Sequence, residues 1–210
     1  MARINGEGVP MKSRPILFSA PMVRALLAGT KTQTRRPLRE GTWLDPKEGV
    51  IRMCSVGNGV TGFQSVACPY GVPGDQLWVR EQFAGSIAYE RHGYPLREWG
   101  NKIWYCADGE PRSGQWTRPR PSIHMPRSLS RITLELTDVR VERLQDISEA
   151  DAQAEGVEYS ERFGGYCIGE AQHFNSHDPR EAYWSIWEAI NGPGSVEANP
   201  WAWCLSFKRV

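Results

Sequence analysis

Prolines and glycines interrupt this chain so often that no long helix can run through most of it. The 210 residues include 15 prolines and 21 glycines. Proline breaks helices and is poorly tolerated inside sheets, and glycine favours turns. A helical bundle needs long uninterrupted segments, so the composition favours a β-rich architecture with many loops. Together with the short helices described below, it predicts an α+β fold.

The length and charge of the chain limit its organisation. A chain of 210 residues suits one buried core better than two full-sized domains. We expect a flexible leader at residues 1–13 and a single domain over residues 14–210. The net charge is +1, so the molecule as a whole has no strong attraction for nucleic acid or for an anionic membrane. Any basic surface must therefore be local.

The N-terminal segment lacks the apolar core of a signal peptide, and no later run of residues is long and apolar enough to span a bilayer. The number of cysteines is odd and no Cys-x-x-Cys pair occurs, which is typical of reduced thiols. These cysteines are Cys54, Cys68, Cys106, Cys167 and Cys204. We expect a soluble, cytoplasmic protein with no membrane partner.

Local patterns predict short helices and strands. Ser19 and Pro21 are typical of a helix start, and Gly29 is typical of a helix end, so residues 21–28 are predicted to be helical. The other predicted helices cover 148–155 and 178–190. The predicted strands cover 16–18, 77–83, 102–106, 132–141 and 201–207, and a change of phase near Thr137 and Asp138 predicts a β-bulge.

Three segments are predicted to be insertions. Residues 39–73 show no persistent period and are rich in turn-forming residues, which indicates a long irregular flap. The other two predicted insertions are residues 84–118 and 157–178. Within the first of them, residues 84–101 are predicted to be loop.

Residues 29–36 read Gly-Thr-Lys-Thr-Gln-Thr-Arg-Arg. The spacing Gly29-x-Lys31-x-x-Thr34-x-Arg36 resembles the signature of the ASCH family, whose β-barrel is similar to the PUA domain of RNA-modifying enzymes. Further blocks that resemble phage and prophage ASCH proteins lie at 14–19, 74–81, 121–127, 154–156 and 199–201. The resemblance implies a PUA-like barrel of five or six strands with short flanking helices, in the cytoplasm of a bacterial host.

The resemblance also implies a function. A small bacterial member of the family hydrolyses N4-acylcytidines with a lysine, a threonine and a glutamate, and other members are described as RNA binders or ribonucleases. Carried onto matching positions, the catalytic residues would be Lys31, Thr34 and Glu155. The implied partners are RNA, another single-stranded nucleic acid or a modified nucleoside. The insertions leave the substrate open, because they alter the surroundings of the pocket.

The chemistry of these residues suits such a reaction. A lysine has a pKa of about 10.4 in water, but in a pocket it can lose its proton and activate a threonine hydroxyl. Glu155 would then carry the proton to the leaving amine. Lys31 and Thr34 are three residues apart, which on a regular strand places them on opposite faces. The chain must therefore turn between them, and Arg36 shares the parity of Thr34.

A second group of residues is predicted to bind the ligand. Arginines mixed with aromatic residues are typical of sites that grip phosphates while stacking bases, and the stretches around Arg35 and around residues 118–131 have this composition. The predicted ligand-binding residues are Gly29, Arg35, Arg36, Arg80, Glu81, Ser122, His124 and Arg127. Trp43, Trp99 and Trp116, in predicted loops, are expected to stack on bases, whereas Trp78, Trp201 and Trp203 are expected in the core.

Alternatives remain at this point. The charged residues would also suit a solvated surface, with Glu155 simply pairing with Lys31. A non-catalytic RNA-binding module and a ribonuclease are the competing functions. Cys167, His173 and His177 are donor types that zinc prefers, but no second cysteine lies nearby, so neither a metal nor another cofactor is expected.

Overall fold

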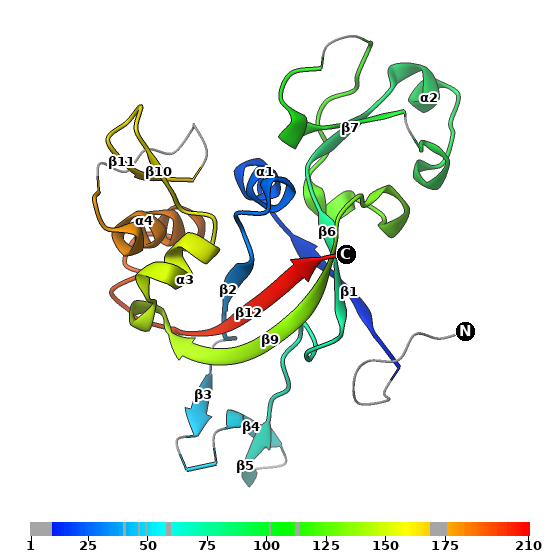
Figure 1. The fold of residues 1–210 in the computed structure, drawn as a ribbon. Coiled ribbons are helices and arrows are strands. Elements are labelled where there is room, and N and C mark those ends of the chain that lie inside the picture. The colour runs from blue at the N-terminus through cyan, green and yellow to red at the C-terminus, as the bar shows by residue number, and fades with distance from the viewer. Residues whose placement is uncertain are drawn as a thin grey trace.

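The computed structural model describes residues 10–39, 41–45, 47–48, 50–57, 60–100, 102–111, 114–168 and 176–210. These residues form a mixed five-stranded sheet, three smaller sheets and four α-helices (Figure 1). The predicted α+β class is confirmed. None of the helices in the described part of the chain is long and apolar enough to cross a membrane.

The five-stranded sheet is the centre of the molecule. β1 pairs in parallel with β6, and the remaining neighbours pair in antiparallel. In spatial order the strands are β1 (Ser13–Leu17), β6 (Gln76–Arg80), β9 (Thr133–Arg143), β12 (Trp201–Arg209) and β2 (Gln33–Pro37). The apolar side chains of these strands share one core with the buried face of α1.

The two edge strands of this sheet approach each other at one point. The Nη2 atom of Arg36 on β2 donates to the carbonyl oxygen of Leu17 on β1 over 2.6 Å. The guanidinium group also lies 5.2 Å from the ring centroid of Phe18. The sheet is therefore strongly curved, as twisted sheets are when their strands bend around a core.

The predicted β-bulge is confirmed. Asp138 of β9 is opposite Ser206 of β12, but Leu136 is opposite Phe207, so Thr137 has no opposing residue. An extra residue of this kind bends its strand and switches the parity of the side chains. The alternation of apolar residues in the sequence changes phase at the same place, near Thr137 and Asp138.

The predicted helices form close to their expected bounds. α1 spans Ala20–Ala28 and ends at Gly29, whose φ of 82° is the left-handed conformation that glycine accepts most easily. α3 spans Glu149–Ala154, and the Oγ atom of Ser148 accepts a hydrogen bond from the backbone N–H of Asp151 at 3.1 Å. α4 spans Pro179–Asn191 and begins at the N-cap residue Asp178.

The prediction of an irregular flap at residues 39–73 is wrong. β3 (Thr42–Asp45), β4 (Val50–Gly57) and β5 (Val60–Ser65) form an antiparallel sheet there. Hydrogen bonding between neighbours in the chain holds these strands together. Of their described side chains only Ile51 is buried in the main core, so the sequence shows little apolar alternation.

A separate small core occupies part of the segment predicted to be loop. β6 ends at Arg80 and β7 (Phe83–Gly85) begins a new strand, so the predicted strand over 77–83 is wrong in extent. The other elements are β8 (Ile103–Tyr105), α2 (Ile87–Arg91) and the short 3-10 helices η1 (Leu96–Glu98), η2 (Cys106–Asp108), η3 (Ser122–His124) and η4 (Arg127–Leu129).

Trp99 belongs to this small core, so its predicted stacking role is wrong. It is 2% exposed and packs among Phe83, Met125 and Leu129. Its ring lies where a Cβ atom at position 85 would stand, and only glycine leaves that space. Trp43 lies on strand β3 instead of a loop and packs edge-to-face on Phe63.

The remaining elements lie beside α3 and α4. η5 (Leu144–Asp146) precedes α3, and the hairpin of β10 (Glu158–Ser160) and β11 (Gly165–Cys167) follows it. In Figure 1 this group lies on one side of α1, and the β7–α2 region lies on the other. α1 therefore stands between two groups of elements, above the central sheet.

Candidate functional site

Lys31 lies at the junction between α1 and β2. Its backbone N–H donates to the carbonyl oxygen of Ala25 at 3.2 Å, which continues the helix end, and β2 begins at Gln33. The N–H of Thr32 donates to Ala154 at 2.8 Å and ties the junction to α3. The chain turns at Gly29, before Lys31, and no turn or bend lies between Lys31 and Thr34, so the predicted turn between these two residues is wrong in position.

The Lys31 ammonium group is committed to Glu155. Nζ lies 2.8 Å from Oε2 of Glu155 and 2.7 Å from its backbone carbonyl oxygen. The two side chains are 0% and 3% exposed, although they are 124 residues apart in the sequence. Glu155 is the C-cap of α3, so the end of this helix places its carboxylate against the α1–β2 junction.

Gly156 makes this close approach possible. Its φ is 96°, and an added Cβ would lie 3.2 Å from the Cβ of Ala25 and 3.3 Å from the Cβ of Lys31. A side chain at this position would separate α3 from the junction. The Ala154-Glu155-Gly156 block therefore places a glutamate beside the lysine and a glycine where the backbones meet.

The surroundings of Lys31 act on its proton affinity in opposite directions. Burial lowers the pKa of Lys31 below its usual value of 10.5, and the Glu155 carboxylate opposes this shift. The nearby charges of Arg36 and Arg35 lower the pKa further, and the net direction is downward. The neutral amine, which is the form that acts as a base, is thereby favoured relative to a lysine in water.

Arg35 extends the charged cluster away from Lys31. Its Nη2 atom lies 2.8 Å from Glu142 and 3.1 Å from Asp151, and its Nη1 atom lies 3.5 Å from Oε1 of Glu155. The side chain is fully buried. Arg140 shares the two outer carboxylates with it.

A pocket of about 320 Å³ lies next to this cluster, between the start of α1, strand β2 and helix α4. We call it the α1–α4 pocket. Its volume is at the lower end of the range of small-molecule sites. The polar residues that line it include Thr34, Arg35, Arg36, Ser122 and Glu155, and the apolar or aromatic ones are Leu17, Phe18, Met22, Pro37, Tyr183, Ile186, Trp187 and Ile190.

Four buried polar atoms of this lining have no hydrogen-bond partner among the described residues. They are Glu155 Oε1, Arg35 Nε, Arg36 Nε and Trp187 Nε1. Buried polar atoms are normally paired, because leaving one unpaired costs about 1–3 kcal/mol. One acceptor and three donors thus surround a single pocket with aromatic walls.

Thr34 and Tyr183 are two of the residues that bring hydroxyl groups to the lining. Thr34 is 3% exposed, and its Oγ1 atom makes no hydrogen bond to any described residue, Lys31 and Glu155 included. Burial, reinforced by the Glu155 carboxylate, raises the pKa of Tyr183 well above 10, so its hydroxyl stays protonated. Both are therefore neutral hydroxyl groups beside a carboxylate.

The structure brings together Lys31, Thr34, Arg35, Arg36 and Glu155, with Ser122 at the same pocket. Lys31 does not itself line the pocket. Its ammonium group lies 5.6 Å from the ring centroid of Phe18, which does line it. It reaches the pocket through Glu155.

The other predicted ligand-binding residues do not line this pocket. Gly29 caps α1, and His124 is exposed on η3. Glu81 is 1% exposed and is held by Arg131 through two contacts of 2.8 and 2.9 Å. Arg80 and Arg127 lie around Trp78, 5.0 and 5.9 Å from its ring centroid.

Sequence reasoning missed the aromatic walls of the pocket. Phe18 contributes one ring, and Tyr183 and Trp187 contribute two more from the buried face of α4. An apolar face that lines a pocket has the same 3.6-residue period as one that packs in a core. The excess of aromatic rings near a predicted polar site was the available signal.

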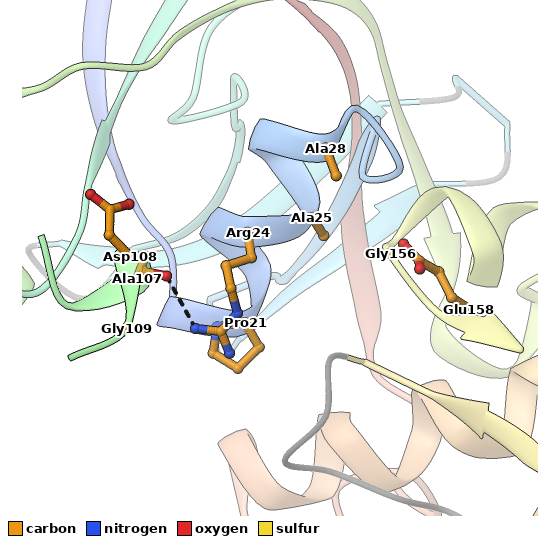
Figure 2. A pocket seen from close by; sticks show the side chains of 9 residues that line it. All are labelled: Pro21, Arg24, Ala25, Ala28, Ala107, Asp108, Gly109, Gly156 and Glu158. Atoms are coloured by element: carbon orange, nitrogen blue, oxygen red, sulfur yellow. Dashed lines mark hydrogen bonds between the residues drawn. The ribbon is translucent and has the colours of Figure 1, made fainter. Parts of the chain in front are cut away.

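A second cavity of about 520 Å³ lies on the other side of α1 (Figure 2). Arg24 projects from the helix there and donates to the carbonyl oxygen of Ala107 at 3.3 Å, with Asp108 and Glu158 to either side. None of the residues that line this cavity carries a buried polar atom without a partner among the described residues. This difference favours the α1–α4 pocket as the ligand site.

The histidines do not change this assignment. His173 lies outside the described residues, and no group of three or more metal-ligating side chains occurs in the part of the chain that the structure describes.

Comparison of the chain with protein-family models, with curated proteins and with solved structures finds no match. The geometry of the pocket is therefore the basis of the functional argument.

Proposed function

We propose that the α1–α4 pocket binds a modified pyrimidine base and that Lys31, Thr34 and Glu155 hydrolyse an N-acyl group from it. One observation carries this proposal: unpartnered polar atoms and aromatic rings surround the same pocket as the buried Lys31–Glu155 pair. Buried charges at a pocket are probabilistic markers of a functional site, and the resemblance to ASCH proteins adds an independent reason.

The lining complements the edge of a base. A pyrimidine presents hydrogen-bond donors and acceptors in one plane and apolar faces on either side. Glu155 Oε1 offers an acceptor for an amide N–H, while Arg35 Nε, Arg36 Nε and Trp187 Nε1 offer donors for carbonyl oxygens. The rings of Phe18 and Trp187 provide apolar surface for the faces.

The proposed reaction begins with the Thr34 hydroxyl. Its oxygen adds to the carbonyl carbon of the acyl group, and its proton passes to the neutral Lys31 amine. Lys31 passes a proton to Glu155 over the 2.8 Å contact, and Glu155 protonates the amine nitrogen as the C–N bond breaks. The products are the free base and an acyl ester of Thr34. Water then hydrolyses the ester, which releases the carboxylic acid and restores the threonine.

We also propose that the curved sheet belongs to a PUA-like barrel of the ASCH type. The contact between Arg36 on one edge strand and Leu17 on the other supports this arrangement. The fit of the helix α1, the Lys31 junction and the α3 end to the family blocks supports it as well.

Hydrolysis of N4-acetylcytidine and N4-benzoylcytidine tests the proposal. Release of cytidine, measured by liquid chromatography, should require the hydroxyl at position 34. Thr34→Val removes it at nearly constant shape and should lower kcat at least about 100-fold, whereas Thr34→Ser should keep most of the activity. Wild-type protein that releases no cytidine from either compound would overturn the catalytic part of the proposal.

A second candidate function is base binding without catalysis. The observation that favours it is the Lys31 ammonium group, which donates hydrogen bonds to two oxygens of Glu155 and to no described oxygen of Thr34. Calorimetric titration with cytidine separates the candidates. Binding to wild type and to Thr34→Val with equal affinity, in the absence of turnover, would leave this second function in place of the first.

A further inference from the structure

Three arginines near the mouth of the α1–α4 pocket have no carboxylate partner within 4.0 Å among the described residues: Arg36, Arg80 and Arg127. Many other arginines of the chain are paired with carboxylates, including Arg14, Arg35, Arg52, Arg120, Arg131, Arg140 and Arg180. The charges of these three guanidinium groups are thus not neutralised by any described carboxylate.

Arg80 and Trp78 lie on the outer face of β6, whereas Arg36 lies on β2 and Arg127 on η4. Arg80 is opposite Leu17, and Trp78 is opposite Pro15 in the parallel register. Val79, between Arg80 and Trp78, is buried, so the side chains on either side of it point outward. Trp78 is half-buried instead of lying in the core as the sequence predicted.

The outer face is continuous with the pocket. Leu17 lines the pocket and is 39% exposed, and Arg36 donates to its carbonyl oxygen. From the spacing of strands and of residues along them, Trp78 lies roughly 8 Å diagonally from Leu17. A ligand that reaches both must be longer than one base.

The helix η3 is a second connection between the pocket and the outer face of β6. Ser122 lines the pocket, and three residues later the carbonyl oxygen of Met125 accepts a hydrogen bond from Arg80 Nε at 2.8 Å. Ile123, between them, is 55% exposed. Arg127 is held by a hydrogen bond to Thr133 at 3.3 Å. Guanidinium groups, a tryptophan and exposed apolar side chains therefore form one strip, which comprises Arg36, Leu17, Ile123, Arg80, Trp78 and Arg127.

We propose that this strip binds the nucleotides adjacent to the base in the pocket, so that the ligand is a single-stranded nucleic acid and not only a free nucleoside. The inference rests on the proposed recognition of a base by the α1–α4 pocket. Unpaired guanidinium groups neutralise phosphates, and their planar faces and those of tryptophan stack on bases.

The test compares a nucleoside with an oligonucleotide. Fluorescence anisotropy with labelled eight-residue pyrimidine RNA and DNA measures the strip, and calorimetric titration with cytidine measures the pocket. Arg80→Gln/Arg127→Gln should weaken oligonucleotide binding about tenfold or more at low salt, and should reduce the slope of log affinity against log salt concentration by roughly 1.4. Its affinity for cytidine should equal that of wild type.

The aromatic ring has its own variants. Trp78→Ala should weaken oligonucleotide binding about 5- to 100-fold, and Trp78→Phe should recover most of the affinity. Arg209→Gln is the matched control, because Arg209 is an exposed arginine that donates only to the backbone of Leu27 among the described residues. A preference for RNA over DNA would show contacts to the 2′-hydroxyl groups, and equal affinity would show contacts to phosphates and bases; both support the strip.

Three results would overturn the inference. Wild-type protein that binds cytidine but binds the oligonucleotides no more tightly would remove the strip and leave the pocket in place. An equal loss of oligonucleotide affinity in Arg209→Gln would show that the strip is not distinguished from other positive charge. Wild-type protein that binds neither probe would remove the pocket function together with the strip.

Discussion

Two buried glutamates of this protein have almost the same exposure but different surroundings. Glu81 is 1% exposed, and both its oxygens accept hydrogen bonds from Arg131. Glu155 is 2% exposed, but only Oε2 and the backbone oxygen accept hydrogen bonds from Lys31. Oε1 accepts no hydrogen bond from the described part of the chain and lies 3.5 Å from Nη1 of Arg35. Both oxygens of the Glu81 carboxylate are thus hydrogen-bonded within the protein, whereas one oxygen of Glu155 can still accept a hydrogen bond from a ligand.

The different hydrogen bonding of Glu81 and Glu155 shows that burial of a charge does not by itself mark a functional site. Arg131 is also paired with Asp108 and stacks 3.9 Å from the ring centroid of Tyr105, so Glu81 belongs to a complete structural network. Glu155 faces a pocket that contains further unpartnered donors. Loss of the carboxylate should therefore affect catalysis at Glu155 and not at Glu81.

The largest expected effect is on turnover. Glu155→Gln removes the group proposed to protonate the leaving amine and should lower kcat for N4-acetylcytidine at least about 100-fold, which is about 2.7 kcal/mol of transition-state free energy. Glu81→Gln should change kcat less than about threefold. Steady-state kinetics of the two variants checks this, and equal losses would break the comparison.

Both variants should also lose stability. In Glu81→Gln the amide NH₂ group must face a donor of Arg131, so we expect a loss of about 2–3 kcal/mol in the free energy of unfolding. In Glu155→Gln the amide oxygen can keep the contact with Lys31, but the buried ammonium loses its carboxylate and the NH₂ group faces Nη1 of Arg35, so we expect a loss of about 3 kcal/mol or more. Urea denaturation measures both, and a loss of less than about 1 kcal/mol for Glu155→Gln would show that the Lys31 amine is neutral in the folded protein.

A backbone substitution should sharpen the account of how Glu155 is placed. Gly156→Ala combines a φ of 96° with Cβ contacts of 3.2 and 3.3 Å, so we expect a loss of about 2–3 kcal/mol. Gly29→Ala is the matched control, because its φ is 82° but no atom lies within 4 Å of the added Cβ. Its expected cost is about 1 kcal/mol. Thermal denaturation with equal losses would show that the contact with Lys31 is unimportant.

The smallest expected effect is a shift in pH dependence. Activity that needs the neutral Lys31 amine rises as pH rises through the apparent pKa of the Lys31–Glu155 pair. The charge of Arg36 lowers the pKa of Lys31, so Arg36→Gln should raise that pKa and move the rising limb of kcat/KM to higher pH. A uniform loss of kcat/KM with the limb unmoved would show that Arg36 acts only on substrate binding.

Local features of the fold were predictable from the sequence. The end of α1 at Gly29, the start of α3 at Ser148 and the bulge at Thr137 each depend on a few neighbouring residues. The strands at residues 42–65 were missed, because pairing between polar neighbours leaves no apolar period. The burial of Trp99 was missed because it depends on space left by Gly85, which lies 14 positions away in the sequence.

The candidate site was only partly predictable. The resemblance to ASCH proteins placed Lys31, Thr34 and Glu155 in one hypothesis, and the structure brings them to the same place. It does not bring Glu81 there, although Glu81 is in an equally well matching block. The aromatic walls contributed by Tyr183 and Trp187 followed from no motif.

Local sequence sets where the chain turns: a glycine that accepts a positive φ ends α1, and Lys31, two residues later, leads into the next strand. The partner of that lysine depends on the tertiary structure. The 124-residue separation between Lys31 and Glu155 is closed by the packing of α3 against β2, and the same packing leaves one oxygen of Glu155 facing a pocket. Turns depend on local conformational energy, whereas partners of buried charges depend on which distant surfaces exclude water together.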